Sequence, residues 1–259
     1  MRLMAALSGR VAWVTGAGTG IGRATAIALA RSGAAVALTG RTVATLEETA
    51  GLLRAAGGTA LIAPADVTDA AAVAAAHAAV VAKLGDPHIL VNNAGWNEAK
   101  RHWKDLTPES VQRLIAGNLA APFLVTLTVL PAMRARRDGV LIHIASLSAT
   151  MIYPVSGPVY TAAKYGARAM SATLNAEEGI HGIRSICINP GEVVTPLLNK
   201  RPVKSSAEAL AKMAQPEDIA DAVLFCATLP ARTCVTELTI MPTDATHFRA
   251  DAEAIAARP

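Results

Sequence analysis

Aromatic and charged residues are scarce in this chain. Of its 259 residues only 3% are aromatic and 17% are charged, whereas 52% are hydrophobic. A chain this apolar can bury a large core, so the composition excludes an intrinsically disordered protein. The formal net charge is 24 − 20 = +4 and there is no basic tail, which argues against a nucleic-acid partner. The densest basic cluster, Arg134–Asp138, is expected to end a helix, where cations suit the helix dipole.

Cysteine pairs, metal-ligand patterns and long apolar runs are also lacking. Cys187, Cys226 and Cys234 are widely spaced and odd in number, so we expect reduced, structural thiols. None of the six histidines has a second ligand at metal spacing, and we expect no catalytic metal. No apolar run approaches the ~18 residues of a membrane span, and residues 1–10 lack the features of a signal peptide. The sequence therefore predicts a cytoplasmic protein with no membrane partner.

Short apolar runs alternate with alanine-rich stretches along the whole chain. The runs predicted as strands are Val11–Thr15, Ala34–Thr39, Ala60–Ala63, His88–Val91, Val140–Ala145, Arg184–Ile188 and Leu238–Met241. The stretches predicted as helices are Ile21–Ser32, Val43–Ala56, Ala70–Leu84, Pro108–Ala135, Tyr160–Glu178 and Pro216–Leu229. This alternation predicts an α/β fold, a Rossmann-type doubly wound three-layer sandwich with a seven-stranded parallel sheet. No linker interrupts it, so we expect a single domain over residues 1–259.

Three segments break this rhythm, at about residues 96–107, 148–159 and 194–206. In doubly wound folds, the loops that follow the carboxyl ends of the strands carry the ligands. We therefore expect these segments to form the substrate loops.

A glycine-rich loop joins the first predicted strand to the first predicted helix. Its sequence runs from Thr15 to Gly22 as Thr-Gly-Ala-Gly-Thr-Gly-Ile-Gly, with the spacing Gly-x-x-x-Gly-x-Gly counted on Gly16, Gly20 and Gly22. Glycines allow positive φ angles and close backbone approach, and the amides of the loop and of the helix N-terminus can face a diphosphate. The loop therefore predicts a dinucleotide site.

Tyr160 and Lys164 lie four residues apart, which places both side chains on one face of a helix. A phenol is a poor proton donor at neutral pH because its ordinary pKa is ~10. An ammonium one turn away stabilises the phenolate, and we expect Lys164 to lower the pKa of Tyr160. The pair is thus a candidate acid/base, although a solvated helix face would have the same spacing.

Several motifs in order resemble those of the short-chain dehydrogenase/reductases, which are single-domain NAD(P)-dependent oxidoreductases. Beyond the glycine loop, the resemblance rests on Asn92–Gly95, Asn118, Ser146, Tyr160-x-x-x-Lys164, Asn189–Gly191 and Thr195. It covers nearly the whole chain. The resemblance implies hydride transfer between NAD(P)(H) and a small carbonyl or secondary alcohol substrate.

The same resemblance implies residue roles. Tyr160 would exchange a proton with the substrate oxygen, Ser146 would hold that oxygen, and Lys164 would also donate to the nicotinamide ribose. Asn118 would hold a water that links Lys164 to solvent. The cofactor-binding residues it implies are Gly16, Gly18, Thr19, Gly20, Ile21, Gly22, Arg41, Asp66, Val67, Asn93, Ala94, Gly95, Tyr160, Lys164, Pro190, Gly191, Val193 and Thr195.

Two neighbouring side chains are rivals for the roles of Ser146 and Tyr160. Ser148 follows Ser146 by two residues, but Ser146 comes directly after the apolar strand, as in the family pattern. Tyr153 has no lysine one turn later. Ser146 and Tyr160 are fourteen residues apart where many members have thirteen, so we expect a slightly longer loop.

Cofactor preference is expected at the end of the second strand, where an NAD enzyme usually carries an acidic residue. This chain has Gly40 followed by Arg41. A guanidinium pairs with a 2′-phosphate, so we predict NADP(H) in preference to NAD. The alternative is that Arg41 is solvated or stacks on adenine while NAD binds, and the glycine loop lacks the basic residue of some NADP-using members.

The sequence indicates less about the substrate pocket than about the cofactor site. Residues of the predicted substrate loops suggest a largely apolar pocket: Trp96, Trp103, Ile152, Tyr153, Leu197 and Leu198. Asn97 and Glu192 could bond either a polar substrate group or the loop backbone, and Pro196–Ser206 is a candidate lid.

Two observations bear on the wider class of function. Pro242-Thr243-Asp244 departs from the Asp-Gly-Gly of many ketoacyl reductases, which favours a small hydroxy-acid or alcohol dehydrogenase. A 3-oxoacyl-type reductase remains an alternative, since Arg134, Arg136, Arg137 and Arg168 could attract an acidic carrier protein. A non-catalytic NAD(P)-binding protein is a further alternative. The helices around Asn118 and after Tyr160 resemble those through which the family forms homodimers and homotetramers.

Overall fold

The computed structural model describes residues 6–200 and 205–244. Its strands form one seven-stranded parallel sheet in the order β3-β2-β1-β4-β5-β6-β7. The strands are β1 (Val11–Thr15), β2 (Ala35–Thr39), β3 (Ala60–Ile62), β4 (Ile89–Asn92), β5 (Gly139–Ile144), β6 (Ile183–Pro190) and β7 (Glu237–Ile240). Each strand overlaps one of the predicted runs, so the predicted parallel sheet is confirmed.

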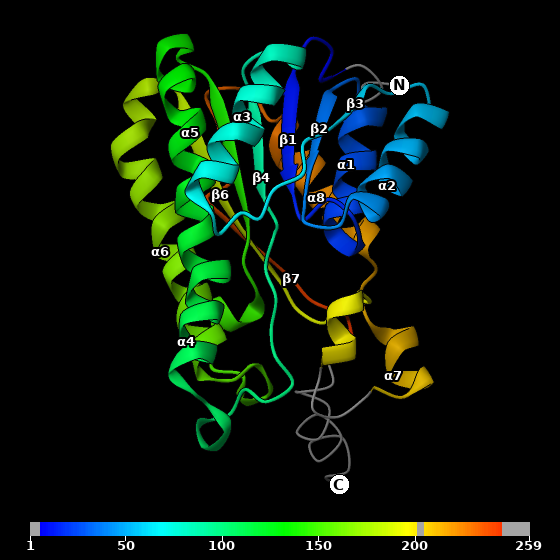
Figure 1. Cartoon of the computed structure of the whole chain (residues 1–259), viewed down its shortest axis with the longest axis vertical. Coiled ribbons are helices and arrows are strands. Elements are labelled where there is room, and N and C mark those ends of the chain that lie inside the picture. Colours follow the sequence, from blue (N-terminus) through cyan, green and yellow to red (C-terminus); the bar gives the residue numbers. More distant parts are fainter. Residues whose placement is uncertain (1–5, 201–204, 245–259) are drawn as a thin grey trace, which may run out of the picture.

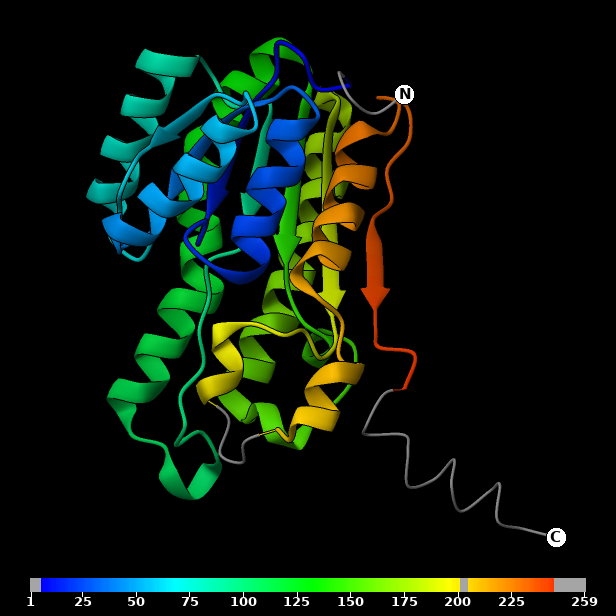
Figure 2. The same ribbon diagram turned by 90° about the vertical axis from the view of Figure 1, so that its right-hand side faces the viewer.

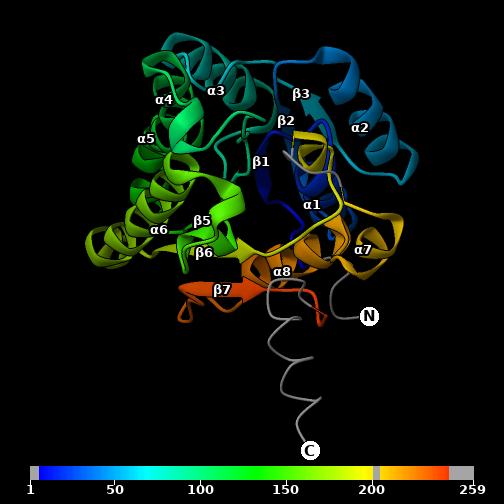
Figure 3. The ribbon, with the colours of Figure 1, turned by 90° about the horizontal axis from the view of Figure 1, so that it is seen from below.

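Helices cover both faces of the sheet (Figures 1 and 3). They are α1 (Gly20–Arg31), α2 (Val43–Ala55), α3 (Ala70–Leu84), α4 (Pro108–Ile115), α5 (Ala121–Arg136), α6 (Pro158–Glu178), α7 (Ala207–Lys212) and α8 (Pro216–Thr228). On one side α1 packs against α2 and α8, and on the other α5 packs against α3 and α6. The three-layer, Rossmann-type α/β sandwich is therefore confirmed. The six-residue α7 was not predicted from the sequence.

The apolar side chains of each strand divide between two cores. Ala12 and Val14 of β1 pack in the cluster beneath α1, α2 and α8. Val11 and Trp13, which alternate with them along the strand, pack in the cluster beneath α3 and α5. Successive side chains of a strand point to opposite faces, so a strand buried on both faces must be apolar throughout. This explains why continuous apolar runs, rather than alternating ones, mark the strands in the sequence.

The strand order creates the place where a ligand can bind. The chain builds outward from β1 through β2 to β3, then returns to place β4 on the other side of β1. The loops after β1 and β4 therefore lead away in opposite directions and leave a crevice at the carboxyl ends of these strands. Figure 2 shows the strands pointing toward one end of the molecule, with α7 and the 3₁₀ helix η6 (Pro196–Lys200) beyond their carboxyl ends.

The predicted continuous helix over Pro108–Ala135 is interrupted. A π-helical turn, η2 (Ala116–Ala120), separates α4 from α5 and contains Asn118. Pro122 has no N–H to donate to the carbonyl of Asn118 four residues earlier, which favours this break. The predicted single helix is therefore corrected to two α-helices joined by this turn.

The segment Pro108–Arg136 is also long and apolar enough to cross a membrane, by length and composition alone. This corrects the expectation that no stretch approaches such a span. Half of its apolar window is buried inside the protein, and its α5 part packs on α3 and β5. Within the described residues, the α5 part of this segment thus lies in one helical layer of the sandwich.

Candidate active site

The glycine loop turns between β1 and α1 with two glycines in left-handed conformations, Gly16 at φ +63° and Gly20 at φ +53°. A Cβ on Gly22 would lie 2.2 Å from the Gly16 carbonyl oxygen, and a Cβ on Gly16 would lie 2.8 Å from Nδ2 of Asn93. The loop can therefore close only without side chains at these positions. The backbone left exposed by this cradle fits the diphosphate of a dinucleotide, because its amides can approach phosphate oxygens closely.

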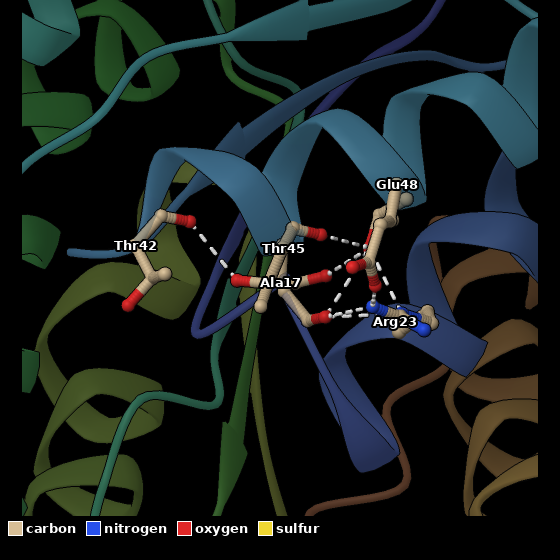
Figure 4. A network of polar contacts seen from close by, with 7 residues as sticks. Ala17, Arg23, Thr42, Thr45 and Glu48 are labelled. Carbon is tan, nitrogen blue, oxygen red and sulfur yellow. Dashed lines mark hydrogen bonds and ion pairs between the residues drawn. The ribbon is translucent and has the colours of Figure 1, made fainter.

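Polar contacts from α1 and α2 brace this loop (Figure 4). Arg23 donates from Nη2 to the Gly18 carbonyl at 2.6 Å and to the Glu48 carboxylate at 2.7 Å. Thr49 donates to the Ala17 carbonyl at 3.1 Å, and Thr45 donates to the Thr42 carbonyl at 2.9 Å. The bonds from Arg23 and Thr49 occupy the Gly18 and Ala17 carbonyl oxygens of the turn. Carbonyls that already accept these bonds leave the loop amides for an anion.

The turn after β4 is bonded to the same loop. Asn93 donates from Nδ2 to the carbonyls of Thr15 and Gly16 at 3.0 and 3.1 Å. The Thr15 hydroxyl accepts from the backbone amides of Asn93 and Ala94, both at 3.1 Å. Four hydrogen bonds thus join the loops after β1 and β4 across the crevice. Their partners are buried or half-buried, so the two ligand-bearing loops form one rigid unit.

Arg41 lies at the end of β2, as predicted, and its guanidinium carbon is 5.1 Å from the centroid of the Trp96 ring. Trp96 in turn packs on Gly117 in η2, where a Cβ would lie 2.0 Å from the indole. Asp66 accepts hydrogen bonds from the backbone and hydroxyl of Thr68, which lower its pKa, and the charge of Arg41 adds to this effect. Val67 is buried beside it. The exposed Arg41 therefore contacts Trp96 and lies within electrostatic range of Asp66.

The loops enclose a cavity of about 440 Å³. It is lined by these predicted site residues: Gly16, Thr19, Gly20, Ile21, Asn93, Ala94, Gly95, Ser146, Tyr160, Lys164, Pro190, Gly191, Val193 and Thr195. The remaining predicted residues, Gly18, Gly22, Arg41, Asp66, Val67 and Asn118, lie outside its lining. The glycine loop and the Ser–Tyr–Lys set, which are far apart in sequence, thus share one cavity. Ser146 lines it, whereas Ser148 is fully buried and donates to the Ser156 hydroxyl.

The pKa of Tyr160 is set differently from the sequence expectation. Burial raises it to about 12, while a hydrogen bond with Ser146 and the positive charge of Arg101 lower it. The Lys164 ammonium lies over the face of the Tyr160 ring, 5.4 Å from its centroid. The expected lowering of the Tyr160 pKa by Lys164 is therefore wrong for this structure, because burial outweighs the groups that lower this pKa. Tyr160 is held as the neutral phenol, which is the form that donates a proton.

Lys164 is buried and donates from Nζ to the Ile144 carbonyl at 3.0 Å. Burial lowers the pKa of Lys164 to about 8. Asn118 donates to the carbonyls of Trp96 and Leu114 and accepts from the Trp96 amide. A Cβ on Gly95 would lie 2.8 Å from Asn118 Oδ1 and 3.5 Å from Lys164 Nζ, so both atoms face this glycine. Gly95 therefore keeps open the space in which a water could bridge them.

The predicted substrate residues divide into two groups. Trp96, Asn97, Tyr153, Glu192, Leu197 and Leu198 line the cavity. Trp103 and Ile152 do not line it, with 80% and 70% of their surface exposed, so their assignment to the pocket is wrong. Asn97 donates to the Ser156 carbonyl at 2.9 Å and thus bonds the loop backbone, one of the two roles considered. Residues 201–204 of the candidate lid lie outside the described residues.

A charged cavity residue, Arg101, was missed by the sequence analysis. Arg101, in the loop after β4, lines the cavity although only 6% of its surface is exposed. It belongs to no motif, and the only signal was a basic residue inside a predicted substrate loop. Its burial depends on contacts with distant loops, which sequence spacing does not reveal.

Two features share one cavity: the glycine loop, at the crevice where the strand order reverses, and the Ser–Tyr–Lys set. Together they define an α/β protein of the dinucleotide-dependent oxidoreductase class. The model of the short chain dehydrogenase family matches residues 10–205, and the chain belongs to this family.

Curated relatives of full length are about one-third identical to this chain. Sepiapterin reductase of Chlorobaculum tepidum is 33% identical over 237 residues, covering 89% of this chain and 95% of that protein. D-beta-hydroxybutyrate dehydrogenase of Rhizobium meliloti is 36% identical over 199 residues, 74% of each chain. The chain also matches glycine betaine reductase ATRR of Emericella nidulans at 32% identity but spans only 19% of its length.

Solved structures agree with the fold. A metagenomic short-chain oxidoreductase in complex with NADP is 34% identical, with a TM-score of 0.80 over 92% of this chain and 99% of that one. The 3-ketoacyl-(acyl-carrier-protein) reductase of Brucella melitensis complexed with NADH is 29% identical, with a TM-score of 0.83 over 92% of this chain and 98% of that one. NAD(P)-binding structures are therefore among its neighbours.

Proposed function

We propose that this protein is an NADP(H)-dependent oxidoreductase that interconverts a small carbonyl compound and the corresponding secondary alcohol, with Tyr160 as the general acid/base. The observation that carries the proposal is the shared cavity: Ser146, Tyr160 and Lys164 line the same space as the glycine loop. A protein that only binds a dinucleotide has no need of a phenol that is hydrogen-bonded to a serine in that space. The family membership supports the same class of reaction.

The roles of the side chains follow from the charge that develops on the substrate. The bound cofactor supplies or accepts the hydride. Oxygen gains negative charge during carbonyl reduction, and donors placed at that oxygen stabilise it. Tyr160 donates the proton and the Ser146 hydroxyl donates a hydrogen bond to the same atom. Since burial raises the pKa of Tyr160 to about 12, the phenol is protonated at neutral pH and ready for the reductive direction.

Proton return to Tyr160 is proposed to pass beside Gly95. Lys164 Nζ and Asn118 Oδ1 both face this residue, and a water there would be within reach of both. The backbone bonds of Asn118 to Trp96 and Leu114 fix the amide, so Oδ1 keeps a constant position. Asn118 is therefore a positioning residue for the proton path rather than a proton donor.

Arg41 supports NADP(H) as the cofactor. It is the cation at the end of β2, where no acidic residue stands, and Trp96 holds its guanidinium through a cation–π contact. A guanidinium pairs with a 2′-phosphate in a bidentate manner, whereas a ribose hydroxyl gains much less from it. The NADH complex of the Brucella melitensis relative is the reason to test both cofactors.

Two arginines considered for an acidic carrier protein are already paired. Arg134 donates to Glu178 at 2.7 Å, and Arg168 donates to Glu237 at 2.8 Å. Their charges are thus partly neutralised, which weakens the case for a 3-oxoacyl carrier substrate. A small free substrate is the better proposal for this chain.

We also propose a homodimer or homotetramer formed through α5 and α6. Phe123 and Leu127, one turn apart on α5, expose 43% and 61% of their surfaces. Two large apolar side chains that are neighbours and exposed to water suit a protein–protein interface. Analytical ultracentrifugation at micromolar concentration tests this, and a monomer mass would contradict it.

The function itself is tested by NADPH oxidation against a panel of ketones and aldehydes, with NADH in parallel. We expect turnover of at least one carbonyl, with NADPH preferred. Tight NADPH binding without turnover of any substrate would instead favour a non-catalytic dinucleotide-binding protein.

A further inference from the structure

The cavity contains a buried cation that the reaction itself does not require. Arg101 is 6% exposed, yet it lines the cavity together with Ser146 and Tyr160. The reacting oxygen already has Ser146 and Tyr160 as donors under the proposed mechanism. A cation at this place therefore suits a second, anionic group of the substrate.

Contacts from two other loops hold Arg101 in position. Its Nη2 donates to the Lys200 carbonyl at the end of η6. Gly157, at φ +77°, packs against it so closely that a Cβ there would lie 2.4 Å from the Arg101 carbonyl oxygen and 2.9 Å from its Cγ. Gly157 is also the N-cap of α6, three residues before Tyr160. The guanidinium is thus fixed relative to the phenol, as a specificity group should be.

The electrostatics of the cavity point the same way. Among the described residues, its lining contains the cationic side chains of Arg101, Lys164 and Lys200 and one carboxylate, that of the buried Glu192. Lys164 serves the ribose and the proton path under the proposed mechanism, so Arg101 is the buried cation on the substrate side. The charge of Arg101 also lowers the pKa of Tyr160, so the guanidinium is within electrostatic range of the reacting hydroxyl.

We propose that Arg101 is the anchor for a substrate carboxylate, and that the substrate is a small oxo acid or the corresponding hydroxy acid. The carbonyl oxygen would lie at Ser146 and Tyr160 while the carboxylate accepts from the Arg101 fork. This inference rests on the proposed function, because it assigns the substrate class of that same site. The planar fork matches a carboxylate in geometry and in charge, and it remains protonated at any working pH.

The rival explanation is that Arg101 only links the loops through Lys200 and Gly157. The two explanations differ in substrate selectivity. A structural link affects every substrate alike, whereas a carboxylate anchor distinguishes an acid from its ester.

The turnover experiment compares 2-, 3- and 4-oxo acids with their methyl esters. In the wild-type protein we expect kcat/KM of the best acid to exceed that of its ester. In Arg101→Gln this acid-to-ester ratio should fall by roughly 10- to 100-fold, mainly through KM of the acid, because a hydrogen bond to a charged group is lost. Arg101→Lys keeps the charge without the fork and should lose less. Lys104→Gln removes a charge from the exposed part of the same loop and should leave the ratio unchanged. An unchanged ratio in Arg101→Gln would overturn the anchor.

A binding experiment separates this inference from the proposed function. Butanoate and butanamide are titrated into the protein saturated with NADP⁺, with heat or tryptophan fluorescence as the signal. We expect butanoate to bind at least about tenfold more weakly to Arg101→Gln than to the wild type, with butanamide much less affected. If no carbonyl is turned over, the proposed function fails while this result still decides the anchor. Equal butanoate binding by both proteins, or none by the wild type, would overturn it.

Discussion

The Lys164 ammonium lies over the Tyr160 ring, 5.4 Å from its centroid, and donates to the Ile144 carbonyl at 3.0 Å. The two residues that the sequence places one helical turn apart therefore meet through the ring face. In this arrangement burial dominates both titrations: it raises the pKa of Tyr160 to about 12 and lowers that of Lys164 to about 8. The Tyr160 phenol is therefore protonated in the free protein, and of the two residues Lys164 has the pKa closer to neutrality.

The titration of Lys164 predicts a pH dependence. Below a pH of about 8 Lys164 carries its charge, and above it the charge is lost. We expect kcat/KM for NADPH to fall as the pH rises through this value, because that constant reports the free enzyme. In Lys164→Arg the charge persists, so the decline should disappear even if the rate is lower. A wild-type profile that stays flat through this pH would contradict the role of Lys164.

The contact between Arg41 and Trp96 predicts that both residues contribute to the preference for NADPH over NADH. Arg41→Ala should lower kcat/KM for NADPH by roughly 10- to 100-fold and change that for NADH much less. Trp96→Leu removes only the cation–π contact and should lower the NADPH preference by about threefold to tenfold. Trp103→Leu is the matched control, since Trp103 is 80% exposed and outside the cavity. An unaltered preference in Arg41→Ala would exclude Arg41 as the reader of the 2′-phosphate.

His143 of β5 predicts sensitivity to acid. It is fully buried, shares a hydrogen bond with Asn92 at 3.2 Å, and its pKa is lowered to about 4 by burial and then by the charge of Lys164. The unfolded chain binds this proton near pH ~6.5, so the stability that His143 contributes is complete above that pH and is lost as the pH falls toward its folded value. Between pH 7 and 5 the wild type should lose roughly 2 kcal/mol more unfolding free energy than His143→Asn.

Urea unfolding of both proteins at the two pH values measures this difference. The other histidines contribute equally to both, so the comparison isolates His143. Equal losses in the two proteins would show that His143 is already protonated in the fold, or that another group governs acid unfolding.

The sheet could be predicted because each buried strand is a short apolar run bounded by polar or glycine residues. The glycine loop could be predicted for a related reason, since Gly22 and Gly16 have no room for a Cβ. The π-helical turn around Asn118 was missed, although Pro122 favours a break there, and the contacts of Asn118 with Trp96 of another loop could not be predicted from the sequence. Arg101 was missed and Trp103 was wrongly placed for the same cause: only the packing of distant loops decides which loop side chain enters the cavity. The pKa of Tyr160 likewise depends on burial, which the spacing to Lys164 does not measure.

The most direct test of the account is Tyr160→Phe, which removes one oxygen atom and keeps the ring under Lys164. On the carbonyl that the wild type reduces best, we expect kcat to fall by at least about 100-fold, since general acid catalysis contributes ~10²–10⁴-fold. NADPH binding, followed by fluorescence titration, should stay within a few-fold of the wild type because the glycine loop and Arg41 are untouched. Tight NADPH binding with turnover close to the wild-type rate would contradict Tyr160 as the acid/base, and with it the proposed mechanism.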